Sequence, residues 1–396
     1  MRVLSLQHLF PLPLDSGGKI KSYHMLKALA GLHELRALAY VRNEQEYSML
    51  SDLRQICPVE TIYLKRGKLR YSSDLISSLI TRKSFIVARD FRAEMHLAVS
   101  NCIEQFKPDV IHIDHLQMAQ FVDFDGPYRI VLDNHNVESV IIKCAAKMAT
   151  DIAQRLYATL EWPKLRRYEL DVCNRCDRVI VVSNEDKATL LGLDPRLTNV
   201  ESVPIGVDIN HYQLIPRSNN LKNILSIGTM YWPPNIDSML YFCREILPLI
   251  KNDIPECTLT IAGQRPVNAI KRLARDPAIS VTGYVDDDRL AAHNCGVFVV
   301  PLRSGSGVRV KILNALAMGL PVVSTSVGAE GLDAVNGKHL LIADSPREFA
   351  DAVKKVLGDN DLSRTLGYNG RELVCAKYSW ERVGEQLLSL YDRLET

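Results

Sequence analysis

The strongest chemical signal in the sequence is a loop with two glycines and two cations. It lies in PLRSGSGVRVKILNALAMGLPVVSTSVGAEGL, which predicts a strand, a glycine-containing loop and a helix that begins near Val308. Gly305 and Gly307 would let backbone N–H groups approach an anion, and the start of the helix adds partial positive charge. Arg309 offers a planar guanidinium and Lys311 a mobile ammonium. The segment predicts a diphosphate site; the alternative is a turning loop with solvated cations.

A second glycine pair lies near the N-terminus, in DSGGKIKS. Gly17 and Gly18 fall between a predicted strand and a predicted helix, where backbone N–H groups could face a phosphate. A tight turn before the helix is the alternative, because a glycine pair is a weak signal. We expect Lys19 and Lys21 to be solvated.

Histidines follow two predicted strands. His135 ends the run YRIVLDNH, and polar residues at strand ends face the ligand crevice of a parallel sheet. Its neighbours include Asp133, Asn136 and Glu138, and so polar a group is hard to bury without partners. We therefore place His135 in the site, with Asn136 on its acceptor side. His115, in PDVIHIDHLQMA, is a weaker acceptor-side candidate, because its spacing could also serve hydrogen bonds in the core.

Two series of alternating strands and helices must position these residues. Short β-branched runs such as RVLSL, ELRALAYV and RVIVVS alternate with amphipathic segments, and the pattern restarts at NILSIGTM. The stretch Val203–Asn220 is predicted to be a linker. We expect an α/β protein with two doubly wound Rossmann-like domains: residues 1–205 together with a final amphipathic helix, 380–396, and residues 206–379.

The bulk composition excludes several classes of protein. The 396 residues exceed one ordinary core, and the net charge of +2 gives no reason to expect nucleic acid as a partner. No run approaches the roughly 20 apolar residues that cross a bilayer. Nine cysteines without a disulfide-like framework predict reduced thiols in a soluble, cytoplasmic protein. We expect Cys173 and Cys176 to pack inside the fold rather than bind a metal.

The cationic loop and its surroundings resemble the donor-binding signature of the retaining glycosyltransferases of family 4. Similar pieces occur along the chain: HLFPLPLDSGGKIKSYHMLKAL, RVIVVSNEDK, VPIGVDIN, NILSIGTMYWPPN, ISVTGYVDD and YSWERVGEQLLSLYDRL. The resemblance implies a GT-B fold, with two facing domains and a last helix that crosses back to the first domain. It also implies an N-terminal acceptor domain and a C-terminal domain that grips a nucleotide-diphosphate sugar.

The same resemblance assigns expected roles within the site. It places His135 beside the donor sugar, with Arg309 and Lys311 on the leaving diphosphate, as the catalytic group. The expected donor-binding residues are Gly17, Gly18, Gly228, Thr229, Gly283, Tyr284, Gly305, Ser306, Gly307, Val308, Asn314 and Glu330. Tyr284 could instead simply pack, and Trp232 could line a sugar pocket or precede a helix. No Asp-x-Asp motif suits the site, because Asp286–Asp288 reads as a helix start.

Two departures from the family bear on activity. The family's paired glutamates, eight positions apart, fall on Ser306 and Asn314, and an arginine and a lysine common after the first strand of the second domain have no counterpart. Asn314 keeps one carbonyl acceptor without charge. Arg309 and Lys311 would supply the missing positive charge.

The sequence thus predicts a retaining glycosyltransferase, and a hexosyltransferase in particular, that works without metal or cofactor. The donor is a nucleotide-diphosphate sugar, and the acceptor is a glycan, lipid-linked, small-molecule or protein hydroxyl. The alternatives are a nucleotide-sugar-binding subunit impaired in catalysis and a GT-B epimerase or phosphorylase. The basic segment LKRGKLRYSSDLISSLITRK is expected to be a solvated face, with peripheral contact to an anionic membrane as the alternative.

Overall fold

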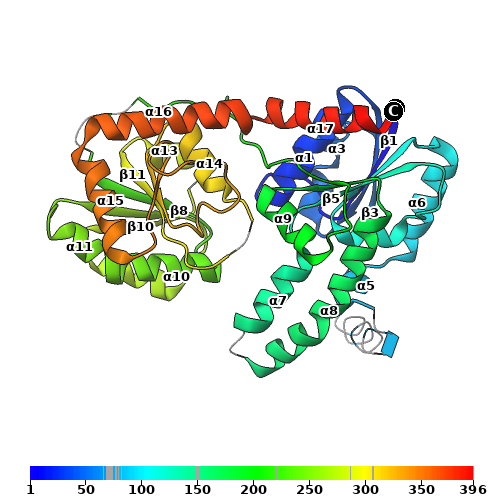
Figure 1. The fold of residues 1–396 in the computed structure, drawn as a ribbon, viewed down its shortest axis with the longest axis horizontal. Coiled ribbons are helices and arrows are strands. Elements are labelled where there is room, and N and C mark those ends of the chain that lie inside the picture. Colours follow the sequence, from blue (N-terminus) through cyan, green and yellow to red (C-terminus); the bar gives the residue numbers. More distant parts are fainter. Residues whose placement is uncertain are drawn as a thin grey trace. The chain divides into compact units, whose positions relative to one another are not determined.

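The computed structural model contains two compact units, each built around one parallel sheet (Figure 1). The structure describes residues 1–65, 67, 75, 78, 80, 81, 83–148, 151–216, 218, 221–285, 287–305 and 307–395. The first unit comprises Met1–Pro204 and Gly384–Thr396, and the second comprises Ile205–Val383. This division falls next to the boundary expected after residue 205.

The first unit contains a seven-stranded sheet with the order β3-β2-β1-β4-β5-β6-β7. All its neighbouring strands pair in parallel. Its strands are β1 Arg2–Gln7, β2 Glu34–Val41, β3 Val59–Tyr63, β4 Val110–Asp114, β5 Arg129–Asn134, β6 Arg178–Val181 and β7 Val200–Ser202. The order reverses between β1 and β4, and ligands of doubly wound sheets bind beside such a reversal, at the carboxyl ends of the strands.

The helices of the first unit connect these strands. They are α1 Gly17–Ala30, α2 Glu44–Ser48, α3 Leu50–Leu53, α5 Phe85–Ala88, α6 Ala93–Phe106, η1 Leu116–Phe121, α7 Glu138–Met148, α8 Ile152–Arg175 and α9 Asn184–Leu193. One face of the sheet presents residues such as Leu4, Ile111 and Leu132 to a single large apolar core. Cys173 of α8 and Cys176, directly after that helix, lie in this core, as expected, where burial raises the pKa of both thiols.

The opposite face of this sheet carries buried polar side chains. His112 of β4 and Asp133 of β5 point away from the apolar core, because side chains alternate between the faces of a strand. The helix α17, Trp380–Glu395, belongs to the first unit from Gly384 onward. Its Tyr391 is fully buried and bonds to His112. The final helix therefore contributes to a polar layer as well as to apolar packing.

The second unit contains a six-stranded parallel sheet with the order β10-β9-β8-β11-β12-β13. Its strands are β8 Asn223–Ile227, β9 Thr258–Ala262, β10 Ile279–Gly283, β11 Cys295–Val300, β12 Val322–Ser324 and β13 Leu341–Ile342. Its helices are α10 Pro233–Tyr241, η2 Phe242–Ile246, α11 Leu247–Lys251, α12 Asn268–Lys271, η3 Arg272–Arg275, α13 Asp288–Ala292, α14 Val310–Ala317, α15 Pro346–Gly358 and α16 Asn360–Lys377. The order reverses here between β8 and β11.

Two apolar cores sandwich the second sheet. Phe298 and Val300 of β11 face one core, which includes residues of α14 and α16, and Val297 and Val299 face the other, which includes residues of α10, η2 and α15. Figure 1 shows these helices in layers on both sides of the strands. A strand with apolar side chains on both faces is the pattern of a buried parallel sheet.

Three further expectations concern the linker, membrane-spanning helices and the basic segment. The stretch predicted as a linker is partly built into the second unit, because Ile205, Val207 and Ile215 are buried in one of its cores. No helix among the described residues has the length and apolar character to span a bilayer. Most of the basic segment at residues 64–83 lies outside the described residues.

Candidate functional site

In the first unit, polar side chains gather at the carboxyl ends of two adjacent strands, β4 and β5. Asp114 is the last residue of β4 and pairs in register with Asp133 of β5. His115 and His135 directly follow β4 and β5. The cluster therefore lies beside the reversal of strand order, where a doubly wound sheet binds ligands.

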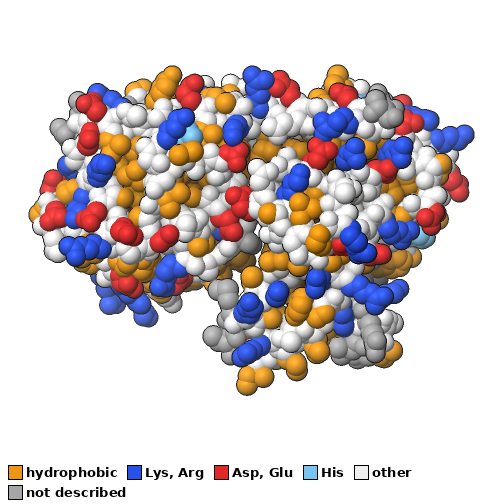
Figure 2. Space-filling model, in the orientation of Figure 1, with side chains coloured by type: hydrophobic (Ala, Val, Ile, Leu, Met, Phe, Trp, Pro, Cys, Tyr) orange, Lys and Arg blue, Asp and Glu red, His pale blue; other side chains and the backbone are white. Residues whose placement is uncertain are grey.

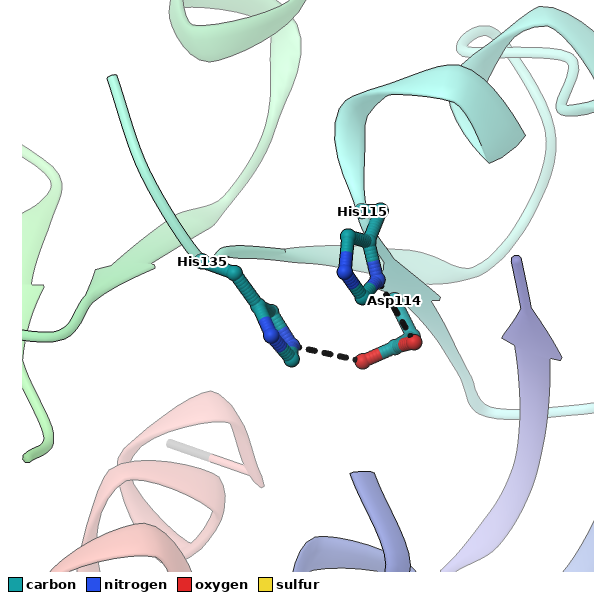
Figure 3. A group of neighbouring side chains, drawn as sticks. All are labelled: Asp114, His115 and His135. Atoms are coloured by element: carbon teal, nitrogen blue, oxygen red, sulfur yellow. Dashed lines mark hydrogen bonds and ion pairs between the residues drawn. The ribbon is translucent and has the colours of Figure 1, made fainter. Parts of the chain in front are cut away.

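Asp114 holds both histidines. Its Oδ1 lies 2.8 Å from Nε2 of His135 and its Oδ2 lies 2.8 Å from Nδ1 of His115 (Figure 3). The two imidazole rings stack with their centroids 3.8 Å apart. Ser22 of α1 donates its hydroxyl to the same carboxylate at 3.0 Å. One buried carboxylate thus fixes the orientation of two rings, and it favours the tautomers protonated at the bonded nitrogens.

The two imidazole rings that share this carboxylate differ in pKa. Burial lowers the pKa of His115, but the charge and hydrogen bond of Asp114, together with the charges of Glu138 and Asp133, outweigh this and leave that pKa raised. Burial and the neighbouring His115 lower the pKa of His135 to about 4. Although burial alone would raise it, the pKa of Asp114 lies well below its ordinary value because both histidines stabilise its charge. At neutral pH His135 is a neutral imidazole whose Nδ1 can accept a hydrogen bond.

The glycine pair at the start of α1 faces this histidine pair. A Cβ atom on Gly18 would lie 3.7 Å from Nδ1 of His135 and 3.8 Å from Nε2 of His115. No side chain caps the helix at Ser16, so its first N–H groups are open to a ligand. The structure brings together Gly18, His115 and His135, which the sequence singled out separately.

The expectation that Lys19 and Lys21 are solvated is wrong. Lys21 is buried and pairs with Asp133. Lys19 forms ion pairs with Asp15 and Glu46. Burial alone would raise the pKa of Asp133, but the positive charge of Lys21, together with His135 and His112, holds it below its ordinary value. Helical spacing turns Lys21 toward the sheet, and a buried ammonium of this kind requires a carboxylate partner.

Sequence reasoning missed Glu169, a buried carboxylate on α8. It accepts hydrogen bonds from Asn134 Nδ2 at 3.1 Å, from the backbone N–H of Glu138 at 2.8 Å, and from the N–H and hydroxyl of Ser139 at 3.1 and 2.5 Å. All these donors flank His135. Glu169 therefore caps α7 and anchors the segment that carries the histidine. Its helical spacing with apolar residues of α8 was the available signal.

In the second unit, two predicted loops meet at the reversal of strand order. Gly228 and Thr229 follow β8, and the glycine loop that leads to α14 follows the adjacent strand β11. Gly263, at the end of β9, adopts φ +150°, and a Cβ there would lie 1.6 Å from the carbonyl oxygen of Gly228. Only glycine fits at that position, and its close approach fixes the path of the Gly228 loop.

The two cations enter this region from the start of α14. The helix begins at Val310 with Arg309 as its cap, two residues later than predicted, and Val308 packs against the core. Arg309 donates to the carbonyl of Gly307 and, at 3.5 Å, to that of Val327. Lys311 Nζ would lie 3.3 Å from a Cβ on Gly228. The glycine loop and the Gly228 loop therefore meet at Lys311.

The free cationic charge of Lys311 is costly in this setting. Burial and the nearby Arg309 lower its pKa to about 8. Its bonded partner is the neutral side chain of Asn235, whose Oδ1 accepts at 3.1 Å. Asn235 in turn donates to the carbonyl of Thr229 at 3.1 Å. Asn235 lies in the first turn of α10. An anion beside Lys311 would raise this pKa toward its ordinary value.

The remaining candidates differ in exposure and backbone conformation. Tyr284 is 69% exposed, so it does not simply pack, and it follows Gly283, which adopts φ +75°. Glu330 is exposed. Burial lowers the pKa of Arg309, and the negative charge of Glu330 offsets part of that shift. Trp232 is exposed and caps α10. Ser306 lies outside the described residues, Asn314 is half-buried on α14, and Asn136 is half-buried after His135. Gly305 adopts φ +136°, with its Cβ direction toward the Arg309 guanidinium.

Three groups of described residues have the ligand types of a metal site. Two share the first unit's cluster, Asp114 with His115 and His135 and, separately, His112 with Asp114 and Asp133. The third is His211 with Asp287 and Asp288. Asp287 caps α13 and binds Arg289, as expected of a helix start.

Comparisons with known proteins match both units. The model for Glycosyltransferase Family 4 matches residues 74–211, and the model for Glycosyl transferases group 1 matches residues 221–359. An uncharacterized 44.6 kDa protein in the cps region of Klebsiella pneumoniae is 21% identical over 94% of this chain and 95% of its own length. A GDP-mannose-dependent α-(1-6)-phosphatidylinositol monomannoside mannosyltransferase of Mycobacterium tuberculosis is 25% identical over 66% of this chain and 78% of its own length.

Solved structures share the fold along the whole chain. Anabaena HepE in complex with UDP-glucose superposes with a TM-score of 0.70 at 13% identity, covering 99% of this chain and 100% of that one. Sucrose-phosphate synthase from Thermosynechococcus elongatus gives 0.69 at 18% identity, covering 100% and 99%. The doubly wound pair of domains expected from the sequence is confirmed.

Proposed function

We propose that this chain is a GT-B group 1 glycosyltransferase. It transfers a hexosyl unit from a nucleotide-diphosphate sugar to an acceptor hydroxyl, retains the anomeric configuration and needs no metal ion. The relatives support a nucleotide-sugar donor: the mycobacterial protein is GDP-mannose-dependent, and HepE forms complexes with UDP and UDP-glucose. A glycan acceptor is supported by a Staphylococcus aureus capsular polysaccharide biosynthesis glycosyltransferase, 32% identical over 30% of this chain.

The observation that carries the proposal is the convergence of Lys311, the Gly228 loop and the start of α14. Lys311 lies against Gly228, its pKa is lowered, and its bonded partner is a neutral amide. A diphosphate would replace that amide with a charged partner. As the bond between the sugar and the diphosphate breaks, negative charge grows on the leaving diphosphate. Fixed cations therefore stabilise the transition state more than the ground state.

The histidine cluster of the first unit fits the sugar side of the reaction. His135 is held by Asp114, and its Nδ1 faces the side of Gly18. A neutral imidazole in that orientation would accept a hydrogen bond from a sugar hydroxyl. The anchored ring needs no reorganisation when the sugar acquires positive character.

A donor panel tests the proposal. The protein is incubated with nucleotide sugars, with and without glycan acceptors, and release of nucleoside diphosphate is measured alongside the NMR anomeric configuration of the product. We expect acceptor-dependent release, retention, and no loss of rate in EDTA. Arg309→Ala should lower kcat about 100-fold or more, while Arg275→Ala, an exposed arginine on η3, should not. Full activity of Arg309→Ala would refute its assigned role.

One observation favours a second candidate, a nucleotide-sugar-binding subunit impaired in catalysis. Asn314 lacks the charge of the glutamate that the family pattern has there, and no hydrogen bond joins its side chain to another described residue. The donor panel separates the two functions: nucleotide-sugar binding without turnover against every acceptor would support the subunit.

A further inference from the structure

The helix α8 exposes apolar side chains on the face opposite to its buried one. Ile152 is 84% exposed, Leu156 58% and Leu160 48%, and they follow one another at intervals of one helical turn. Its buried residues Ala158 and Leu165 lie about 180° around the helix from this stripe. The packed face is held by Glu169 and by Glu161, which accepts from Ser84. The helix therefore cannot turn the stripe inward.

Basic side chains surround the stripe. Lys143 and Lys147 of α7 and Arg155 and Arg167 of α8 are exposed. Between Lys143 and Arg167, the exposed acid among the described residues is Asp151, which caps α8 through the N–H of Gln154. Figure 1 shows α7 and α8 as a hairpin that projects from its own sheet, and Figure 2 shows hydrophobic and basic side chains side by side at its free end.

We propose that the α7–α8 tip, defined by Ile152, Leu156, Leu160, Lys147 and Arg155, docks on a membrane surface that contains anionic lipid. Apolar side chains beside exposed cations are the chemistry of a helix that lies at the interface of a bilayer. Each cation near an anionic surface raises the partition coefficient about fivefold. The charge complementarity favours lipid over a second copy of the chain, whose tip would carry the same positive charge.

The helix α8 connects the α7–α8 tip to the histidine cluster. The carboxylate of Glu169 binds the segment that flanks His135, and Ile152 begins the same helix. At 1.5 Å per residue, the tip lies about 25 Å along α8 from Glu169. A docked tip would therefore hold the acceptor side of the first unit within reach of membrane-bound molecules. This inference does not depend on the proposed donor or on turnover.

Vesicle sedimentation tests the proposal without any nucleotide sugar. The full chain is mixed with vesicles of phosphatidylcholine alone or with about 30% phosphatidylglycerol, at low and high salt. We expect binding to the anionic vesicles that weakens as salt rises. The combined variant Ile152→Ser, Leu156→Ser and Leu160→Ser should lower the partition coefficient at least about tenfold. Lys147→Glu with Arg155→Glu should abolish the preference for anionic lipid.

The matched control replaces two apolar residues of the same unit outside the tip. Leu32 is 68% exposed and Leu97 62%, so the variant Leu32→Ser with Leu97→Ser should bind vesicles like the unaltered protein. Circular dichroism melts check that each variant folds. Equal binding by the tip variant and the unaltered protein, or no vesicle binding by the latter, overturns the proposal. Concentration-dependent dimerisation lost in the tip variant would assign the stripe to a second copy instead.

Discussion

Replacing Lys311 with methionine should make the protein more stable and at the same time weaken its grip on the donor. The pKa of Lys311 is lowered from 10.5 to about 8, a difference that corresponds to about 3 kcal/mol of penalty on the charged form at neutral pH. Partial exposure screens this cost, and loss of the hydrogen bond to Asn235 costs about 1 kcal/mol. We expect a net gain of about 1 kcal/mol in the free energy of unfolding at pH 7.

The sign of the pH dependence follows from the same shift. Between about pH 8 and 10.5 the folded protein has released the Lys311 proton, while the unfolded chain still binds it. This group therefore raises stability with pH in that window, and Lys311→Met should lack the rise. A bound diphosphate favours the charged lysine, so its binding should take up a proton above about pH 8 and weaken as the pH rises further.

Two measurements check this reasoning. Urea unfolding at pH 7 and 9.5 gives stability, and calorimetric titration with a nucleoside diphosphate in two buffers gives affinity and proton uptake. Losing one charge-assisted contact should raise Kd about 30-fold at pH 7. Lys271→Met, at an exposed lysine of α12, serves as the control. Unchanged affinity together with an unchanged pH profile in Lys311→Met would refute the placement of the diphosphate.

Three further predictions concern the first unit. Glu169→Ala should destabilise the protein by about 3 kcal/mol and lower kcat more than it changes KM, because it frees the segment that carries His135; Glu169→Gln should recover part of both in urea melts and kinetics. Lys21→Met should cost about 3 to 5 kcal/mol by leaving Asp133 buried without its cation. The pKa of Asp133 then rises, so acid unfolding should begin at higher pH than in the unaltered protein. Because the pKa of His135 is lowered to about 4, the ring should stay neutral, and kcat should show no loss from this group between pH 8 and about pH 5. A fall in kcat centred near pH 6.5 would contradict a neutral, buried ring.

The alternation of strands and helices could be predicted because the spacing of apolar residues along the sequence follows which side chains are buried. The runs ending at Asp114 and at His135 gave the two strands of the histidine cluster, and both lie where parallel strands end at one edge of the sheet. The short edge strands β3, β7 and β13 were not predicted. Strands of two to five residues at a sheet edge carry too little periodicity to stand out from loops.

Side-chain pairs between residues far apart in the chain could not be predicted from the sequence. Lys21 and Asp133 are separated by 112 positions, and His112 and Tyr391 by 279. A lysine in an amphipathic helix looks solvated until a buried carboxylate is placed opposite it, and this placement comes only from the stacking of α1 on the sheet. Glu169 was missed for the same reason, because its partners lie on another helix. The roles of the candidate residues in binding and turnover remain predictions.

The two departures from the family pattern have a common physical consequence at α14. A glutamate at position 314 would lie three residues beyond Lys311 on the same helix, within reach of its ammonium. Such a carboxylate would stabilise the charge of Lys311 in the absence of ligand and compete with a diphosphate for it. In the family pattern, an additional arginine and lysine after the first strand would offset that competition; we expect Lys311 and Arg309 to supply this charge here. A neutral Asn314 leaves the lowered pKa of Lys311 to be restored by the donor itself, so binding energy is realised where negative charge develops.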